Sequence, residues 1–319
     1  MKLFLCGPNA FGSVHNNPDL RLSDWLLSRG WEFTSRPESA QAVFVTEFPD
    51  SKMLRLIANA GKAGKTLVLI QEPEVVRPNN KLATIRSSGL RLIEVGRPNP
   101  LVRWPNVWPD NLEENFRIRK ERRAVMVAAN KISLIKGELY SLRRKTITEN
   151  PDLVLAGPSW DISSVDFAIK AMKELAITAS WKRIPQITGL SSPVIGRKLV
   201  SPVANKIKFV SQFKVSVVIE NSAEYQSEKL LDALLAGTIP VYVGPDPRFF
   251  GIPNGLVNWL GESRDIRSSI EKALSQDYKA WSNLARSWLI DNTDTREMWS
   301  YDSLWTRVDR ELRELADSD

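Results

Sequence analysis

Residues 213–245 read FKVSVVIENSAEYQSEKLLDALLAGTIPVYVGP, and this stretch decides the fold. An apolar run, Val215–Ile219, leads into a polar loop. A leucine-rich segment with helical spacing then starts near Ser227, and Gly237 closes it. A second apolar run, Ile239–Val243, follows at once. The stretch therefore predicts a strand–loop–helix–strand unit of a parallel sheet.

The polar residues of this unit gather where α/β proteins bind anions. Asn221, Ser222 and Tyr225 follow the first strand, and Glu228 and Lys229 fall in the first helical turn. Free backbone N–H groups and the helix dipole converge at this place in open α/β sheets. Lys229 adds a positive charge that suits a phosphate. The alternative is an ordinary solvated Glu–Lys pair, but the polar side chains massed in the loop favour the anion site.

The N-terminal part alternates predicted strands with predicted helices, which indicates a parallel, doubly wound sheet. From Arg97 onward, four prolines and two tryptophans interrupt the pattern, and neither a helix nor a central strand tolerates them. Residues 97–121 are therefore predicted to connect two domains, partly ordered by Trp104 and Trp108. The predicted strands are Lys2–Cys6, Ala42–Thr46, Thr66–Gln71 and Arg91–Val95, and the predicted helices are Leu22–Ser28 and Ser51–Ala63.

A second α/β pattern follows this connection. We predict an N-terminal domain over residues 1–121, a C-terminal domain over 122–290, and a last helical segment over 291–319 that docks on the N-terminal domain. Residues 181–208 are predicted to form a long ordered loop. The further predicted strands are Ala124–Ala129 and Leu153–Ala156, and the further predicted helices are Lys136–Thr148, Val165–Leu175, Arg264–Ser275, Tyr278–Ile290 and Arg296–Ala316.

The composition is that of an ordinary globular protein with two domains. The chain has 319 residues, of which 43% are hydrophobic and 25% charged. One cysteine, Cys6, cannot form a disulfide within the chain, so a reducing, cytoplasmic location is expected. No apolar run reaches the length of about 18 residues that a membrane-spanning helix needs. One histidine and one cysteine cannot build the usual zinc site, whereas a carboxylate-bound divalent ion stays open.

Residues 213–245 resemble the donor-site signature of the family 10 glycosyltransferases, the α-1,3/1,4-fucosyltransferases, in their bacterial type without a membrane anchor. That signature combines Glu-Asn-Ser, Tyr-x-Thr-Glu-Lys, a helix and x-Pro-Val-x-x-Gly. The chain carries Glu220-Asn221-Ser222, then Tyr225-Gln226-Ser227-Glu228-Lys229, then Ile239-Pro240-Val241-Tyr242-Val243-Gly244. Order and spacing hold, with Ser227 in place of the threonine. The resemblance implies an α/β fold with two Rossmann-like domains facing a cleft, the GT-B type.

The resemblance also implies a reaction and a set of donor contacts. The reaction is inverting, metal-independent transfer of L-fucose from GDP-fucose to a hydroxyl of a glycan acceptor. The helix start at Ser227 and Lys229 would bind the diphosphate. Ribose and sugar hydroxyls would meet the remaining polar residues of the signature, which are Asn221, Ser222, Tyr225 and Glu228.

Glu72 lies at the carboxyl tip of the predicted strand Thr66–Gln71, because Pro73 stops that strand. A carboxylate there faces the crevice of an α/β sheet, and an inverting transferase needs a base that removes the acceptor's proton. The family carries its proposed base in a Glu-Ser-Pro or Glu-Asn stretch at the equivalent place. The resemblance therefore implies that Glu72 is the general base, with Glu74 as the fallback. A solvated loop glutamate is the alternative.

Lys136 is the candidate for a second phosphate contact. The family has Ser-Asn at the end of the first strand of its donor domain and, some residues later, an arginine that holds the phosphates. Here the strand ends in Ala129-Asn130-Lys131, and Lys136 follows Asn130 by six residues. Lysine would supply a point charge instead of a bidentate fork. Arg143 and Arg144 are more distant substitutes, and a plain surface lysine is the alternative.

The net charge of +7 admits several partners. Nucleic acid is not expected, because the basic residues are dispersed and no nucleic-acid motif accompanies them. A nucleotide-sugar donor and peripheral contact with the inner face of an acidic membrane account for the charge equally well. The last helix would then touch the membrane instead of docking, although its balanced charges favour docking. A glycan acceptor is the other expected partner. Trp160 and Trp181 are candidates for stacking on an acceptor sugar, with core packing as the alternative.

Two other functions stay open at this stage. A transferase of the same architecture could use another nucleotide sugar, since a looser version of the strand–helix–Pro-Val turn occurs in exostosin-like enzymes. A non-catalytic basic protein that binds polyanions is the more distant alternative.

Overall fold

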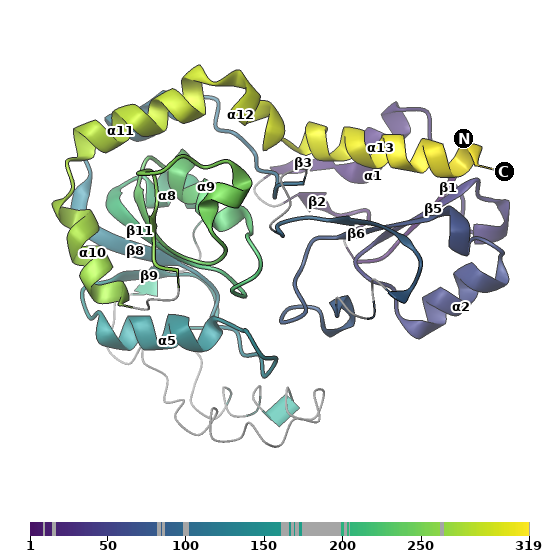
Figure 1. Ribbon diagram of the computed structural model, residues 1–319, viewed down its shortest axis with the longest axis horizontal. Helices are drawn as coiled ribbons and strands as arrows, with labels where there is room; N and C mark the ends of the chain where they lie inside the picture. Colours follow the sequence, from purple (N-terminus) through teal and green to yellow (C-terminus); the bar gives the residue numbers. More distant parts are fainter. Residues whose placement is uncertain are drawn as a thin grey trace. The chain divides into compact units, whose positions relative to one another are not determined.

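A computed structural model describes residues 1–8, 10–14, 17–81, 84, 87–97, 102–160, 166, 169, 172–173, 199–200, 203, 205–261 and 265–318. The chain divides into two units (Figure 1). The N-terminal unit comprises Met1–Val107 together with Glu297–Asp319, and the C-terminal unit comprises Trp108–Arg296. The stretch 97–121, predicted as a connection, is thus shared between the two units.

The N-terminal unit is built on a parallel sheet in which the described strands follow the order β4-β1-β5-β6-β7. Counted along the chain this is the order 2-1-3-4-5, so the winding direction reverses between β1 and β5. The strands are β1 (Lys2–Cys6), β4 (Glu32–Phe33), β5 (Ala42–Thr46), β6 (Thr66–Ile70) and β7 (Arg91–Glu94), and a separate hairpin is formed by β2 (Ser13–Val14) and β3 (Asn17–Arg21).

Both faces of this sheet are buried. Successive strand residues point to opposite sides, so neighbouring residues belong to different buried clusters. Leu3, Phe44 and Leu67 belong to one buried cluster, which includes residues of α1 (Leu22–Ser28) and α13 (Tyr301–Asp317). The neighbouring residues Phe4, Val43 and Val68 belong to a second cluster on the opposite face, which includes Ile57 of α2 (Ser51–Asn59). The unit is therefore a doubly wound α/β layer structure.

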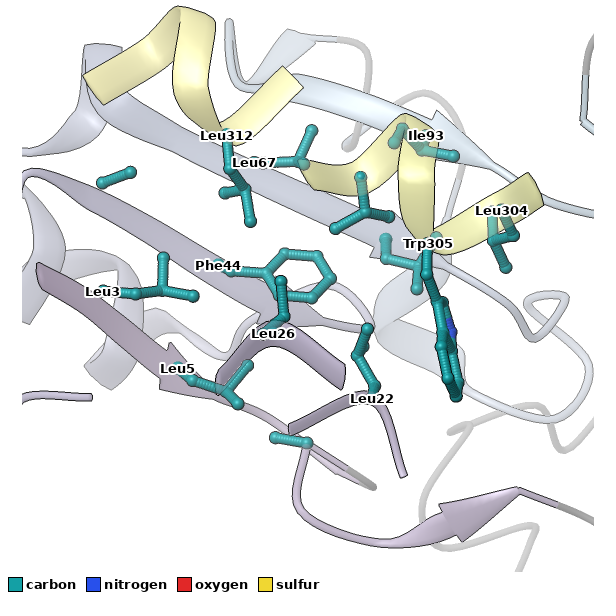
Figure 2. Close-up of a cluster of buried hydrophobic side chains, with 14 of the residues drawn as sticks. Leu3, Leu5, Leu22, Leu26, Phe44, Leu67, Ile93, Leu304, Trp305 and Leu312 are labelled. Atoms are coloured by element: carbon teal, nitrogen blue, oxygen red, sulfur yellow. The ribbon is translucent and has the colours of Figure 1, made fainter. Parts of the chain in front are cut away.

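Helix α13 supplies a large part of the first cluster, although it lies at the far end of the chain. Leu304, Trp305 and Leu312 are buried against the sheet, as Figure 2 shows. The indole N–H of Trp31 also donates to Asp309 Oδ1 at 2.6 Å. The apolar face of α13 is thus occupied by the core of the N-terminal unit.

The C-terminal unit contains a second parallel sheet, in which the described strands follow the order β10-β9-β8-β11-β12-β13. Counted along the unit this is the order 3-2-1-4-5-6, so the winding direction reverses between β8 and β11. The strands are β8 (Glu121–Val127), β9 (Val154–Ala156), β10 (Leu199–Val200), β11 (Phe213–Ile219), β12 (Ile239–Val243) and β13 (Asn258–Trp259).

Helices pack on this sheet, and four of the described ones, α8, α9, α10 and α11, start at side chains that accept a first-turn backbone N–H. Among them, Ser227 caps α9 and Asn205 caps α8. Helix α9 contacts β11, β12 and α8, and α10 contacts β8, β11, β12 and α5. Among the described residues of the unit, the helices are α4 (Leu112–Arg117), α5 (Tyr140–Glu149), α8 (Lys206–Val210), α9 (Glu228–Leu235), α10 (Ile266–Ser275), α11 (Tyr278–Arg286) with a π-helical turn at Ser287–Asp291, and α12 (Thr293–Met298), which reaches the unit boundary.

The structure corrects two predictions of helix position. The helix predicted from Lys136 starts only at Tyr140, because Gly137 has a left-handed φ of 90° that a helix cannot contain. The helix predicted over Arg296–Ala316 is two helices, α12 and α13, and Ser300 caps the second.

Two segments predicted as irregular contain helices. Helix α4 lies inside the predicted connection, and the ring of its Phe116 stacks on Trp281 with centroids 6.4 Å apart. Helix α8 starts at Lys206, inside the predicted loop 181–208. Most of the predicted helix Val165–Leu175 and most of that loop, including Trp181, lie outside the described residues.

Candidate functional site

The loops that follow β8 and β11 meet at the point where the winding of the C-terminal sheet reverses. The N–H of Leu139 donates to the carbonyl of Asn221 at 3.1 Å, and Glu138 pairs with Ser222 in an antiparallel bridge. The loop carrying Lys136 therefore runs beside the polar loop of residues 220–227. Lys136 itself is exposed in the turn before α5.

Glu220 is the buried centre of this site, with none of its surface exposed. Its carboxylate accepts the backbone N–H of Ser227 at 3.1 Å and the hydroxyl of Ser227 at 2.6 Å. Gly244 leaves room for it, since a Cβ at that position would lie 2.8 Å from Glu220 Cγ. Burial raises the pKa of Glu220, although the nearby Lys229 and the bonds from Ser227 lower it in part.

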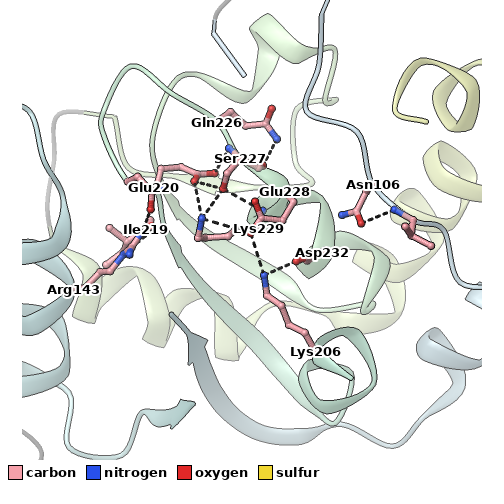
Figure 3. Close-up of polar contacts among 12 residues, drawn as sticks. Asn106, Arg143, Lys206, Ile219, Glu220, Gln226, Ser227, Glu228, Lys229 and Asp232 are labelled. Atoms are coloured by element: carbon pink, nitrogen blue, oxygen red, sulfur yellow. Dashed lines mark hydrogen bonds and ion pairs between the residues drawn. The ribbon is translucent and has the colours of Figure 1, made fainter. Parts of the chain in front are cut away.

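Lys229 faces carboxylates as well as the helix start (Figure 3). Its Nζ donates to Ser227 Oγ at 2.8 Å and lies 3.8 Å from Glu220 Oε2 and 3.7 Å from Glu228 Oε1. The side chain keeps only 16% of its surface exposed. Its charge is therefore already shared with two acidic groups of the protein.

Lys206 extends this network along α9. Its ammonium group donates to Asp232 and lies 3.8 Å from Glu228 Oε1. Burial lowers the pKa of Lys206, but the charges of Asp232 and Glu228 outweigh burial, so the pKa is raised overall. Two ammonium groups thus face three carboxylates, counting Glu220, and this cluster carries excess negative charge when all five groups are ionised.

Arg143 and Arg144 are turned to the protein itself and not to a ligand. Arg143 is 2% exposed and donates to the carbonyl of Ile219 at 2.6 and 3.0 Å and to Asn221 Oδ1 at 3.0 Å. Arg144 donates to the carbonyl of Lys131 at 2.6 Å. The arginines therefore fix the ends of the two loops, and their substitute role as phosphate contacts stays a prediction.

The other signature residues lie inside the loop between β11 and α9. Tyr225 is 1% exposed and Ser222 is 8% exposed. Gln226 is fully buried, and its Nε2 donates to the carbonyl of Ser227 at 2.6 Å. Arg143 already donates to the amide oxygen of Asn221, which leaves one lone pair of that oxygen and the NH2 group for a ligand.

The predicted base and its fallback lie in the N-terminal unit. Glu72 follows β6 by two residues, and both Glu72 and Glu74 are half-buried. The backbone N–H of Glu72 lies 3.4 Å from Oε2 of Glu47, and its carbonyl accepts from Asn80 Nδ2 at 2.7 Å. The strand end thus brings two carboxyl side chains together.

Several residues of these sites were missed in the sequence. Glu47 follows an apolar strand just as Glu72 does, so the same strand-end pattern could have identified it. Arg143 was considered only as a ligand contact, and no sequence pattern indicates that it bonds the end of β11. Trp160, a candidate for sugar stacking, is 1% exposed and its indole N–H donates to the carbonyl of Ala128 at 2.6 Å, so it is a core residue.

Among the described residues, no group of three or more His, Cys, Asp or Glu side chains is arranged to hold a metal ion. No helix in the described part of the chain combines the length and the apolar character needed to cross a bilayer.

Comparison with known proteins shows a likeness at the level of the fold. No family model and no curated protein matches the chain. A crystal structure of an α1,3-fucosyltransferase aligns over 100% of this chain and 90% of its own, with a TM-score of 0.55 and 15% identity. A crystal structure of α1,3-fucosyltransferase with GDP aligns over the same shares, with a TM-score of 0.52 and 14% identity. The chain has the α/β fold of the GT-B glycosyltransferases.

Proposed function

We propose that this chain is an inverting glycosyltransferase that moves L-fucose from GDP-fucose to a hydroxyl group of a glycan, without an essential metal ion. One observation carries the proposal. The donor-type signature folds as β11, a polar loop, α9 and β12 at the winding reversal of a 3-2-1-4-5-6 sheet. Ligands of such sheets bind at this reversal, and the positive end of a helix dipole, as at the start of α9, favours an anion.

Diphosphate departure develops negative charge, which fixed cations and helix N–H groups stabilise. Lys229 is assigned to this charge because its ammonium lies at the start of α9, 2.8 Å from the capping hydroxyl of Ser227. Lys136 is assigned as a second cation because its loop runs beside the signature loop. A bound diphosphate would take over the place that Glu220 and Glu228 hold beside Lys229.

The neutral hydroxyls of the ribose and the sugar need directional partners. Asn221, Ser222, Tyr225 and Glu228 are assigned to them, since all four belong to the loop between β11 and α9 or to the first turn of α9. Tyr225 is buried in this conformation, so its assignment requires the loop to rearrange when the donor binds.

Glu72 is assigned as the general base, with Glu74 as the fallback. The hydroxyl of the acceptor loses its proton to this carboxylate while its oxygen attacks the anomeric carbon and GDP leaves. Glu72 is half-buried and follows β6 by two residues, at the carboxyl end of a strand where ligands of α/β sheets bind.

A panel of nucleotide sugars tests the proposal. Thermal shift and radiolabel transfer to glycans are measured with GDP-fucose, GDP-mannose, UDP-glucose and UDP-N-acetylglucosamine. We expect GDP and GDP-fucose to raise the melting temperature and GDP-fucose alone to support transfer. Transfer from a UDP-sugar would mean that the donor is that nucleotide sugar and not GDP-fucose. If no nucleotide sugar shifts the melting temperature and nucleic acid binds with steep salt dependence, the polyanion-binding alternative replaces the proposal.

A further inference from the structure

We propose that Glu47 and Asn80 form a clamp that positions the Glu72 carboxylate for proton removal. The inference rests on the proposed function, because it concerns the base assigned there. Glu47 and Asn80 touch the backbone beside Glu72 and are therefore positioning residues and not catalytic ones.

The first part of the clamp is the side chain of Glu47, which is only 4% exposed. Its Oε1 accepts the backbone N–H of Gln71 at 3.2 Å, and its Oε2 lies 3.4 Å from the backbone N of Glu72. Oε2 also accepts from Asn80 Nδ2 at 2.5 Å. Donors therefore surround the carboxylate on both oxygens, which leaves it no access to a substrate.

The second part is Asn80, which is fully buried. Besides its bond to Glu47, its Nδ2 donates to the carbonyl of Glu72 at 2.7 Å. Its Oδ1 accepts the backbone N–H of Phe48 at 3.0 Å. The N–H and the C=O of Glu72 are thus both held, from two different segments of the chain, and the Cα–Cβ direction of Glu72 is fixed by them.

The arrangement is expensive for the fold, which argues for a role beyond packing. Glu47 has a left-handed φ of 66°, and this conformation costs a residue with a Cβ about 1–2 kcal/mol. Burying a carboxylate adds a desolvation penalty that hydrogen bonds only offset. Strained and buried polar residues concentrate at functional sites, and this one lies at the strand ends from which Glu72 projects.

The charge of Glu47 is part of the clamp. An ionised carboxylate accepts N–H groups on both oxygens, whereas a protonated one turns an O–H toward one of those donors. The pKa of Glu47 is raised to about 7 overall, because burial and the charge of Glu72 raise it by more than the hydrogen bonds from Asn80 and the backbone lower it. Glu72 is the charged group that faces Glu47, and its other partners, Gln71 and Asn80, are neutral. The clamp therefore loosens as the pH falls through about 7.

The test compares Glu47→Gln with the wild-type protein in GDP-fucose transfer. The NH2 group of glutamine is a hydrogen-bond donor and would face N–H donors that now bond to Glu47. The clamp therefore opens while the side-chain volume stays almost the same. We expect kcat to fall about 10–100-fold, as for a catalytic group displaced by about 1 Å. GDP affinity, which is assigned to the C-terminal unit, should stay unchanged, and the inflection of the kcat–pH profile near pH 7 should disappear.

A second variant and a matched control keep the test decisive. Asn80→Ala leaves the charge of Glu47 in place, so it reports on the clamp even if Glu47→Gln fails to fold. In the double variant the loss of kcat should match the larger single loss, because the two residues act as one unit. The control is Thr66→Val, at the opposite end of β6, where the hydroxyl of the buried Thr66 donates to the carbonyl of Lys62 at 2.7 Å. It should lower stability and leave kcat unchanged.

The outcomes separate the clamp from the function on which it rests. A wild-type protein that transfers fucose, with folded variants that keep its kcat and pH profile, would overturn the clamp alone. A fall in kcat that Thr66→Val reproduces would also overturn it, since any loss of stability would then suffice. A wild-type protein that transfers no sugar from any donor would overturn the proposed function and the clamp together.

Discussion

At the scale of single residues, the two carboxylates that follow parallel strands have opposite environments. Glu220 after β11 is fully buried and bonded to Ser227, whereas Glu72 after β6 is half-buried. The carboxylate of Glu220 is therefore held inside the protein, and that of Glu72 is the one to which proton removal is assigned. Sequence position alone treats them alike, because both simply follow an apolar strand.

Glu72→Gln is expected to abolish transfer while leaving donor binding intact. Glutamine keeps the shape of the side chain but cannot accept the acceptor's proton, so kcat should fall by about 10²–10⁴. Transfer kinetics measure the loss, and calorimetry with GDP checks binding. Glu74→Gln is the matched control, half-buried in the same loop. If Glu72→Gln keeps the activity of the wild type, Glu72 is not the base. If Glu74→Gln loses activity instead, the role of the base passes to Glu74.

Lys229→Ala is expected to weaken GDP binding by about tenfold, or roughly 1.4 kcal/mol, because one phosphate contact is lost. Titration calorimetry with GDP measures the change. Lys145→Ala serves as the control, since this lysine of α5 is 66% exposed and pairs only with Glu149 among the described contacts. Unchanged GDP affinity in Lys229→Ala would contradict the phosphate role and leave Lys229 as the counter-charge of Glu220 and Glu228.

At the scale of elements, most strands and the signature helix could be predicted from the sequence, because apolar runs and helical spacing are local signals. β1, β5 and β12 match their predicted bounds. Local signals failed where a turn or a distant contact decided the outcome. The left-handed backbone of Gly137 shifts the start of α5 to Tyr140. Phe116 of α4 packs on Trp281, which is far away in the sequence.

The candidate sites divide in the same way. The signature residues of the polar loop were identified from their order and spacing, since they are consecutive in the chain. The partners that hold them come from other elements, such as Arg143 of α5 and Lys206 of α8. Glu47, Glu72 and Asn80 likewise come together only through the pairing of β5 with β6. Contacts of this kind depend on sheet order, which a single sequence does not encode locally.

Lys120 joins three elements of the C-terminal unit through one ammonium group. It donates to the carbonyl of Asn115 in α4 at 2.6 Å, to that of Ser211 after α8 at 2.6 Å, and to that of Ala236 after α9 at 3.0 Å. Carbonyl groups at helix ends carry partial negative charge, so a cation suits this place. Burial nevertheless lowers the pKa of Lys120 to about 7.

This lowered pKa predicts a pH dependence of stability. Between about 7 and the ordinary value of 10.5 the unfolded chain binds a proton at Lys120 that the folded chain does not. The free energy of unfolding of the wild type, relative to Lys120→Met, should therefore rise with pH in this window, by at most about 1.4 kcal/mol per pH unit. Urea unfolding at a series of pH values measures it.

Lys145→Met, at an exposed lysine, should show no such slope. A flat difference between the wild type and Lys120→Met would mean that the three carbonyl groups keep the ammonium ion charged despite its burial.

At the scale of the whole molecule, the two units differ in how the chain builds them. The C-terminal unit is one continuous segment, Trp108–Arg296, and the N-terminal unit needs Met1–Val107 together with Glu297–Asp319. Helix α13 buries Leu304, Trp305 and Leu312 in the N-terminal core. That core cannot be completed without it.

A fragment of residues 108–296 is therefore expected to fold and to bind GDP by itself, because its sheet and its site residues lie within that segment. A fragment of residues 1–107 should remain largely unfolded, since the apolar face that α13 covers is exposed. Circular dichroism and calorimetry with GDP measure both. A cooperative unfolding transition in residues 1–107, or a lack of one in residues 108–296, would contradict this division.

The return of the chain to its first sheet also sets an order of events during synthesis. Strands β1 to β7 leave the ribosome first, yet the helix that covers them, Tyr301–Asp317, is translated after the whole of the C-terminal unit. Domains usually fold in the order in which they emerge. Here the C-terminal unit can fold before the N-terminal unit is complete. Until α13 is translated, the N-terminal sheet keeps an uncovered apolar face. A nascent chain that stops before residue 301 would then expose apolar surface that chaperones bind. Only chains that carry the last helix would have a fully folded N-terminal unit around Glu72.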